Sequence, residues 1–220
     1  MKTSTLRSAA LFMGSVAVLA AMAPTVAAQE PAGPLLPLSS VLPPLQLKAG
    51  DPYYFCLTDA TEKALTQAHI TFDAVTPNTV VTYKSHTCMR GTLKSGQINT
   101  DLTGLAGEGT GGFAFQRDGK RAEFTTPRVA LHLDMTGTWT AEHQGRRVDM
   151  FSSTREGAKL SLTRVSAENL PMTLTPAGEQ ALSAAFGTSP VPAGQPFFEG
   201  NASFDVLNSV TGLLNPNPNP

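Results

Sequence analysis

The sequence predicts a mainly β fold: an antiparallel, β-rich, sandwich-like domain with two short helices. Runs of alternating apolar and polar residues recur along the chain, which is the pattern of half-buried strands. Asp118-Gly119 and Gln144-Gly145 are two-residue turns of the kind that join antiparallel neighbours. Only two stretches carry the capping residues and the apolar stripe of a helix. Strands therefore dominate, and their turns make them antiparallel.

The first helix is predicted in the stretch TDATEKALTQAH, from Thr58 to His69. Thr58 or Asp59 caps its start, and Glu62 places an acid in the first turn. Its apolar stripe consists of Ala64, Leu65 and Ala68. Strands are expected to follow over Ile70–Val75, Val80–Tyr83 and Met89–Leu93.

The clearest hairpin joins Phe113–Phe115 to Lys120–Phe124 through the Asp118-Gly119 turn. With this turn, Phe115 lies opposite Ala122 and Phe113 lies opposite Phe124, so apolar pairs share one face. The preceding cluster GEGTGG, residues 107–112, is followed by a strand and lacks a Lys-Ser/Thr pair. A phosphate-binding loop needs a helix at that point. We therefore interpret these glycines as residues that let a strand bend and other backbone come close.

The remaining strands alternate in the same way. Val129, Leu131, Leu133 and Met135 form one face of a half-buried strand, with His132 and Asp134 on the other. The Gln144-Gly145 turn is predicted to join Thr138–Ala141 to Arg146–Ser152. Further strands are expected over Ala158–Thr163, part of Ser166–Leu174 and Asn201–Val206.

The second helix is predicted in TPAGEQALSAAFG, which begins at Thr175. Thr175 caps it, Pro176 occupies the first turn and Gly187 ends it. Its buried stripe consists of Leu182, Ala185 and Phe186.

The two ends of the chain have different compositions from the middle. Residues 1–28 have the basic start, apolar run and Val26-Ala27-Ala28 cleavage site of a secretory signal peptide. Residues 29–52 form a proline-rich linker or strap, residues 53–207 the β-rich domain, and residues 208–220 a disordered tail. The sequence thus predicts a protein that is secreted, extracellular or associated with the cell envelope.

Charge and cysteine content indicate which partners and which covalent bonds to expect. The formal net charge is −1, which argues against capture of nucleic acid, and no apolar run is long enough for a membrane span. Cys56 and Cys88 both fall in the exported part, where we expect them to form a disulfide. The alternative, a metal site built on His86 and Cys88, needs further ligands that the neighbouring sequence does not offer.

No familiar catalytic motif is present, so we expect neither an enzyme nor a metal site. The chain has no G-x-S-x-G and no H-E-x-x-H. His132 and Asp134, two residues apart, are the one pair suited to acid–base chemistry. His69 and His143 are expected to be structural or exposed, and Arg146-Arg147 to be a solvated hairpin end.

Two sequence motifs resemble those of a known protein family. Thr126-Pro127-Arg128-Val129 matches a strand of pattern n-P-r-v, and a helix of pattern lT-x-x-G-x-x-a-l/f follows. The residues matching that helix are Leu174, Thr175, Gly178, Ala181 and Leu182. The region from Ile70 to Val206 thereby resembles the HtaA-like domain of secreted and surface proteins of actinobacteria. This resemblance implies an antiparallel β-rich fold and, in characterised members, a haem-binding role at the cell envelope.

The residues that bind haem in the family have no clear counterparts in this sequence. Haem-binding members use a tyrosine near the domain start and a histidine in an H-x-G-x-L element. Gly109–Phe113 matches that element here, and Gly109 occupies the histidine position. None of Tyr53, Tyr54 and Tyr83 can be assigned as the ligand. The possible ligand-binding residues are Tyr53, Tyr54, Gly109, Gly111 and Gly112.

We therefore expect a non-catalytic binding module without a cofactor. Its partner would be a small apolar ligand or an envelope protein. The alternative is a haem-binding protein of an iron-acquisition system with a rearranged ligand set.

The exported chain is predicted to begin near Gln29, because signal peptidase cleaves after small residues such as Val26-Ala27-Ala28. Amino-terminal sequencing of the secreted protein checks this. Recovery of an intact chain starting at Met1 from the cytoplasm, as the main native form, would contradict it.

Overall fold

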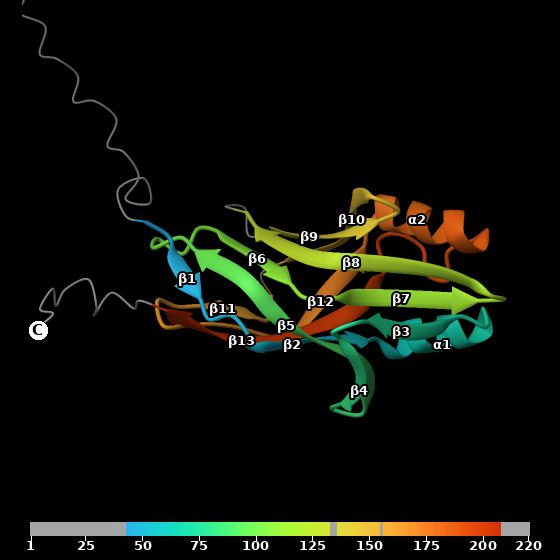
Figure 1. Ribbon diagram of the computed structural model, residues 1–220, viewed down its shortest axis with the longest axis horizontal. Coiled ribbons are helices and arrows are strands. Elements are labelled where there is room, and N and C mark those ends of the chain that lie inside the picture. The colour runs from blue at the N-terminus through green and yellow to red at the C-terminus, as the bar shows by residue number, and fades with distance from the viewer. Residues whose placement is uncertain (1–42, 133–135, 155, 208–220) are drawn as a thin grey trace, which may run out of the picture. The chain divides into compact units, whose positions relative to one another are not determined.

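The computed structural model describes residues 43–132, 136–154 and 156–207. The predicted signal peptide, most of the predicted linker and the predicted tail lie outside these ranges, as do Leu133, Asp134 and Met135. In chain order the strands and helices (Figure 1) are β1 (Leu45–Leu47), β2 (Pro52–Leu57), α1 (Asp59–Gln67), β3 (Thr71–Val75), β4 (Thr79–Tyr83), β5 (His86–Ile98), β6 (Leu105–Gly109), β7 (Gly112–Arg117), β8 (Lys120–Leu131), β9 (Thr136–His143), β10 (Arg146–Thr154), β11 (Ala158–Leu160), β12 (Arg164–Leu174), α2 (Pro176–Phe186) and β13 (Pro196–Leu207).

The main sheet closes on itself. Its strands follow the order β13-β2-β5-β6-β8-β9-β10-β12, and β12 pairs again with β13, so eight antiparallel strands form a barrel. The mainly β class and the antiparallel pairing are as the sequence predicts. The sandwich-like arrangement is not: a sandwich has two separate sheets, whereas here the pairing of β12 with β13 leaves one continuous wall.

The barrel incorporates the end of the segment that the sequence predicts as a linker. Strand β1 pairs with both β13 and β5, and therefore occupies the same position in the wall as β2. Leu45 and Leu47 on this strand are each 3% exposed. Because these two leucines alternate with Gln46, the strand buries one face in the barrel even though prolines precede it.

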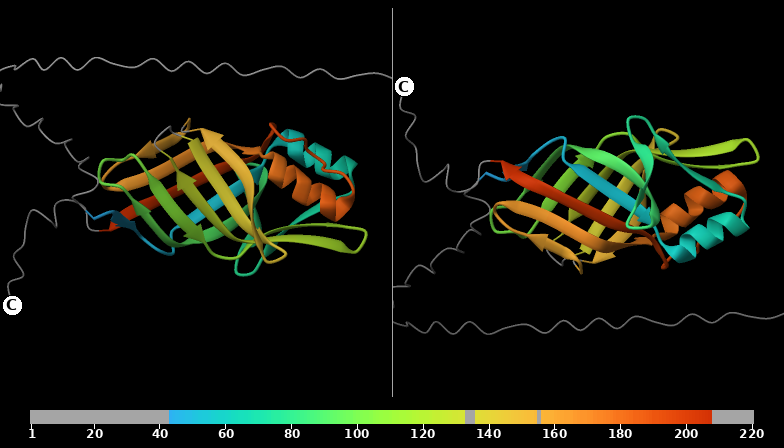
Figure 2. Two further views of the ribbon diagram at one scale, coloured as in Figure 1. Left: turned by 90° about the horizontal axis from the view of Figure 1, so that it is seen from above. Right: turned by 90° about the horizontal axis from the view of Figure 1, so that it is seen from below.

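An extension of the sheet and both helices cover one end of the barrel. The hairpin of β7 and β8 runs beyond the barrel wall and adds β3 as a third strand. Figure 2 shows α1 and α2 side by side at this end, while the first and last described residues lie at the opposite end. None of the helices among the described residues has the length and apolar character needed to cross a membrane.

Local signals predict most of these elements. Thr58 and Thr175 are the N-caps, and Gly187 ends α2 with φ +82°. Both two-residue turns are present, with positive φ at Asp118, Gly119, Gln144 and Gly145. Phe113 pairs with Phe124, and Phe115 pairs with Ala122. Strand β6 was not predicted, because its sequence LAGEG has no β-branched or aromatic residue.

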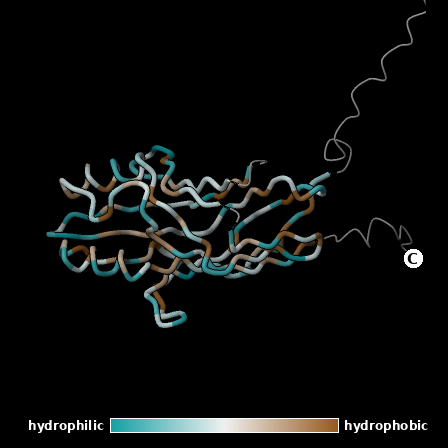
Figure 3. The backbone as a smooth tube through the Cα atoms, turned by 180° about the vertical axis from the view of Figure 1, so that it is seen from behind, coloured by the Kyte–Doolittle hydropathy of each residue, from teal (hydrophilic) through white to brown (hydrophobic). Residues whose placement is uncertain are grey.

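The interior separates into a large and a small apolar cluster. Hydrophobic and hydrophilic residues alternate along the strands (Figure 3), so one face of each strand supplies the interior. The large cluster lies towards the helices and contains six fully buried phenylalanines: Phe113, Phe115, Phe124, Phe151, Phe197 and Phe198. The small cluster is built around Leu45, Leu47, Leu93, Ile98 and Val165.

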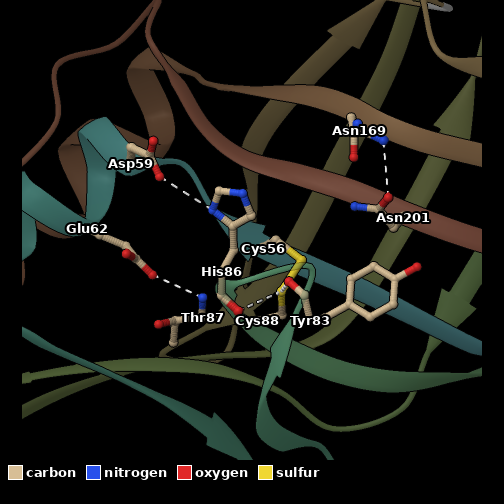
Figure 4. The surroundings of a disulfide bond; sticks show 9 residues. All are labelled: Cys56, Asp59, Glu62, Tyr83, His86, Thr87, Cys88, Asn169 and Asn201. Carbon is tan, nitrogen blue, oxygen red and sulfur yellow. Dashed lines mark hydrogen bonds and ion pairs between the residues drawn. A yellow bond between two sulfur atoms is a disulfide. The ribbon is translucent and has the colours of Figure 1, made fainter.

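The predicted disulfide between Cys56 and Cys88 is confirmed. The two residues are direct cross-strand partners on β2 and β5, and both are buried. Close by, His86 Nδ1 lies 3.5 Å from Asp59 Oδ1, and the Thr87 amide donates to Glu62 Oε1 at 3.0 Å (Figure 4). The disulfide and the start of α1 are thereby joined around the beginning of β5.

Replacing both cysteines by alanine should lower the free energy of unfolding by about 3 to 4 kcal/mol, because the 32-residue separation is then no longer constrained in the unfolded chain. Urea unfolding of the two proteins measures the difference. Thiol labelling of the denatured, unreduced wild type should find no free thiol. A loss well below about 1 kcal/mol would mean that the bridge contributes little.

Candidate functional site

The half of the barrel remote from the helices is incompletely filled. Two adjoining cavities of about 50 Å³ and about 70 Å³ lie inside it. Six residues line both: Val129, Trp139, Ala167, Leu170, Ala202 and Phe204. Because these side chains are apolar or nearly so, the cavities suit an apolar occupant rather than water. The rest of the site is built around this space.

Trp139 stands between the two cavities. It lies on β9 between Gly137 and Ala141, whose small side chains leave room on the same inward face. Its indole Nε1 donates to Ser153 Oγ at 2.9 Å, and its ring meets Phe55 edge to face with centroids 5.4 Å apart. The hydrogen bond satisfies the one polar atom of the side chain, so the ring itself can face the cavities.

Tyr53 closes the cavity on the side of the large cluster. It is 6% exposed, and its hydroxyl donates to the carbonyl of Thr110 at 3.3 Å. The ring occupies space that two glycines leave open. A Cβ at Gly91 would lie 2.5 Å from Cζ of this ring, and a Cβ at Gly109 would lie 2.8 Å from it. No larger residue fits at either position without displacing Tyr53.

Burial raises the pKa of the Tyr53 phenol well above its ordinary range, and a hydrogen bond to Asn78 offsets this only in part. The phenol therefore stays protonated at neutral pH. It is a hydrogen-bond donor at the end of an apolar cavity and does not supply a negative charge there.

The candidate residues from the sequence fall into three places. Tyr53 and Gly109 line the first cavity. Gly111 and Gly112 pack against protein instead: a Cβ at Gly111 would meet Asn78 at 2.7 Å, and one at Gly112 would meet Cα of Thr125 at 2.8 Å. Tyr54 alternates with Tyr53 along β2 and lies outside the barrel.

Tyr54 stacks on Tyr83 beside the disulfide. The two ring centroids are 4.3 Å apart and the ring planes differ by 11°. Figure 4 shows the Tyr83 hydroxyl pointing away from Cys56 and Cys88. This pair belongs to the outer face and has no contact with the interior cavities.

His132, His143 and Arg147, all named from the sequence, have local partners. His132 Nε2 lies 3.1 Å from Thr138 Oγ1, and His143 stacks on Phe124 with centroids 4.6 Å apart. Arg147 Nη1 donates to the carbonyl of Thr126 at 2.7 Å. Asp134 lies outside the described residues, so its pairing with His132 is not described. The ranges 43–132, 136–154 and 156–207 hold no group of three or more metal-ligating side chains.

Sequence reasoning missed the cavity and its principal residues. The alternation of Gly137, Trp139 and Ala141 in β9 places the single tryptophan of the chain between two small residues on the inward face. This small-large-small pattern is a signal that a strand faces a space shaped around one ring. Gly91 and Ala202 carry no such signal, because their importance depends on strands that are distant in the sequence.

Comparisons with known proteins support the fold. No protein-family model matches the chain, and no curated protein sequence does. The structure resembles the C-terminal domain of HtaA from Corynebacterium glutamicum, with a TM-score of 0.56 and 13% identity over 73% of this chain and 99% of that domain. The haem-binding protein HtaB of the same organism gives a TM-score of 0.47 and 9% identity, over 75% and 96% of the two chains. The described domain thus has an HtaA-like fold.

The haem group that the sequence resemblance implies does not fit the interior. Sites for ligands of that order of size span about 300 to 1,000 Å³, several times the volume of either cavity. A histidine at Gly109 would overlap the tyrosine ring.

Gly109→Ala should destabilise the domain by about 1 to 3 kcal/mol, because the added methyl group overpacks the Tyr53 ring. Gly200→Ala is the matched control: it also lies on the barrel wall, but its nearest neighbour would be Met172 Sδ at an ordinary 3.5 Å. Thermal or urea unfolding compares the two variants. In a Tyr53→Leu background the cost of Gly109→Ala should largely disappear, and equal costs in both backgrounds would contradict the proposed packing.

Proposed function

We propose that this chain, whose described domain has the HtaA-like fold, is a non-catalytic binding module of the cell envelope that takes a small apolar ligand into the hollow half of its barrel. The supporting observation is the pair of adjoining apolar cavities around Trp139. An eight-stranded barrel has an interior that side chains just fill or that holds one small ligand. Phenylalanines fill the helix side of this barrel, and smaller side chains leave the other side open.

The chemistry of the lining supports binding rather than catalysis. The Tyr53 hydroxyl donates to a backbone carbonyl, and the Trp139 indole donates to Ser153. Both donors are therefore engaged, and the raised pKa of the Tyr53 phenol removes it as a base at neutral pH. What remains for a ligand is an apolar surface, so affinity would come from desolvation and from shape.

Two features support a location outside the cytoplasm. The predicted signal peptide directs the chain out of the cytoplasm. The Cys56–Cys88 disulfide suits an oxidising environment. Both agree with a role at the envelope or outside the cell.

Benzene should bind saturably and shift the indole N–H signal of Trp139. An apolar cavity of about 150 Å³ binds benzene, and the two adjoining cavities together approach this scale. Trp139 is the only tryptophan, so a nitrogen–proton correlation spectrum contains one indole signal to follow during the titration.

Two leucine variants test the position of that site. Ala202→Leu adds bulk to a wall shared by both cavities and should abolish the saturable shift. Thr140→Leu adds bulk on the outer face of β9, next to Trp139, and should leave the shift intact. A linear, non-saturating response in the wild type, or an unchanged response in Ala202→Leu, would refute the interior site.

The alternative function is haem binding through a rearranged ligand set, which the family resemblance favours. Because the interior does not accommodate haem, this function would have to use the outer tyrosines. Tyr54 and Tyr83 are the remaining two of the three tyrosines in the chain, and both are partly exposed. The proposal of haem binding depends on one observation, which is that Tyr54 and Tyr83 stack on each other beside the Cys56–Cys88 disulfide.

Titration of hemin into the mature chain should give a weak, non-saturating change in visible absorbance, as for hemin on a general apolar surface. Tyr54→Ala and Tyr83→Ala should leave this weak change unaltered, because adsorption of hemin to a general apolar surface does not depend on either side chain. A saturable one-to-one complex with a tyrosinate-type spectrum, abolished by one of these substitutions, would establish the alternative function instead.

A further inference from the structure

A second hollow lies on the outer face of the barrel. It has a volume of about 290 Å³ and is bounded by Tyr83 and Lys84, where β4 ends, and by strands β11, β12 and β13. This volume is close to the lower end of known small-ligand sites, at about 300 Å³. The hollow contains residues that the interior site does not use.

One side of the hollow is aromatic. Tyr54 on β2 and Tyr83 on β4 stack on each other, and Lys84 Nζ lies 5.7 Å from the centroid of the Tyr83 ring. The stack fixes both rings, so a ligand that contacts them loses little side-chain entropy of the protein. Tyrosine offers an apolar ring and a polar hydroxyl together, which suits ligands that have both kinds of surface.

The opposite side is polar, and strand register brings it together. Tyr54 pairs with Asn201 across β2 and β13. Ser203 pairs with Ser166 across β13 and β12, and Ser166 pairs with Lys159 across β12 and β11. Asn201 and Ser203 lie two residues apart on β13. The polar groups beside the tyrosines therefore form two neighbouring rows, with the amide of Asn201 in one and the hydroxyl and ammonium groups of Ser203, Ser166 and Lys159 in the other.

The charges around the hollow nearly cancel. Lys84 Nζ donates to Glu168 Oε1 at 2.8 Å, and this hydrogen bond raises the pKa of Lys84, with a smaller effect from the charge of Glu199. The hydrogen bond from Lys84 likewise lowers the pKa of Glu168, and the charge of Lys159 contributes to the same shift. Lys84, Lys159 and Glu168 line the hollow, and Glu199 lies outside the lining but close enough for its charge to act on Lys84. Two positive and two negative charges therefore lie in or near the hollow, which leaves little net attraction for a strongly charged ligand.

We propose that this outer hollow is a binding site for a neutral carbohydrate. A sugar ring presents an apolar face of C–H groups that can pack against the stacked tyrosine pair, and a rim of hydroxyls that can both donate and accept. The described lining provides the aromatic side and the hydroxyl and amide groups, and the charge of Glu199 outside the lining offsets the second lysine. A phosphate ligand would lack arginine partners in this lining, and an apolar ligand would leave the polar groups without hydrogen bonds.

This inference is independent of the interior site. Ala167 and Ala202 line both spaces, so a single layer of small residues separates them. The ring of Tyr83 and the side chain of Lys84 belong to the outer hollow alone. Variants at Tyr83 therefore test the carbohydrate site while the response of Trp139 to benzene reports on the interior.

The test is a titration of the mature chain with maltotriose, mannotriose and arabinotriose, followed by saturation-transfer NMR and calorimetry. At least one of these neutral trisaccharides should bind saturably. Tyr83→Ala should weaken that binding by about tenfold, and Tyr83→Phe, which keeps the ring, should change it by less than about threefold. Ser203→Trp fills the hollow and should abolish binding. Thr82→Ala, an exposed neighbour on the same strand, is the matched control.

Circular dichroism and an intact Cys56–Cys88 bridge establish that each variant is folded. Failure of all three trisaccharides to bind the folded wild type would overturn the proposal, as would binding that survives both Tyr83→Ala and Ser203→Trp. Binding of digalacturonic acid in preference to the neutral sugars would also overturn it, because it would require a net positive site.

Discussion

Closure of the sheet by the pairing of β12 with β13 is the constraint on which the rest of the structure depends. A closed wall fixes the volume inside, and side chains or a ligand must fill it. On the side of the helices six phenylalanines do so, with rings in contact at centroid distances such as 4.9 Å between Phe197 and Phe198. On the other side the inward residues include Gly107, Ala167, Gly200 and Ala202, and space is left over. The difference between the two halves is a difference in side-chain volume along the same strands.

Tyr53 marks the boundary between these halves. Its ring is held where Gly91 and Gly109 leave room, and its hydroxyl is satisfied by the carbonyl of Thr110. The glycine cluster therefore has a packing role at this point, because Gly109 accommodates a buried tyrosine ring. The two binding sites that we propose lie elsewhere, in the apolar space around Trp139 and in the hollow beside Tyr83.

Local chemistry made part of this structure predictable. The hydroxyls of Thr58 and Thr175 accept hydrogen bonds from backbone amides in the first turn of each helix. The Asp118-Gly119 turn adopts the positive φ values that place Phe113 opposite Phe124. Closure was not predictable, because it depends on pairs such as Cys56 and Glu199, whose strands β2 and β13 are far apart in the sequence. The packing of the Tyr53 ring against two glycines was not predicted for the same reason. Gly91 and Gly109 lie on β5 and β6, whereas Tyr53 lies on β2. The volume left in the cavities is a sum over distant side chains, which no short sequence pattern records.

We propose that the half of the barrel around Trp139 is an apolar space able to hold a ligand while the Tyr53 ring stays packed against Gly91 and Gly109. Diffraction from crystals of the mature protein under xenon pressure tests this most directly, since xenon enters apolar cavities and scatters strongly. We expect a xenon site bounded by Trp139, Ala202 and Phe204, with the Tyr53 ring packed against Gly91 and Gly109. An interior filled by side chains with no xenon at this position, or a Tyr53 ring turned out of the barrel, would contradict it.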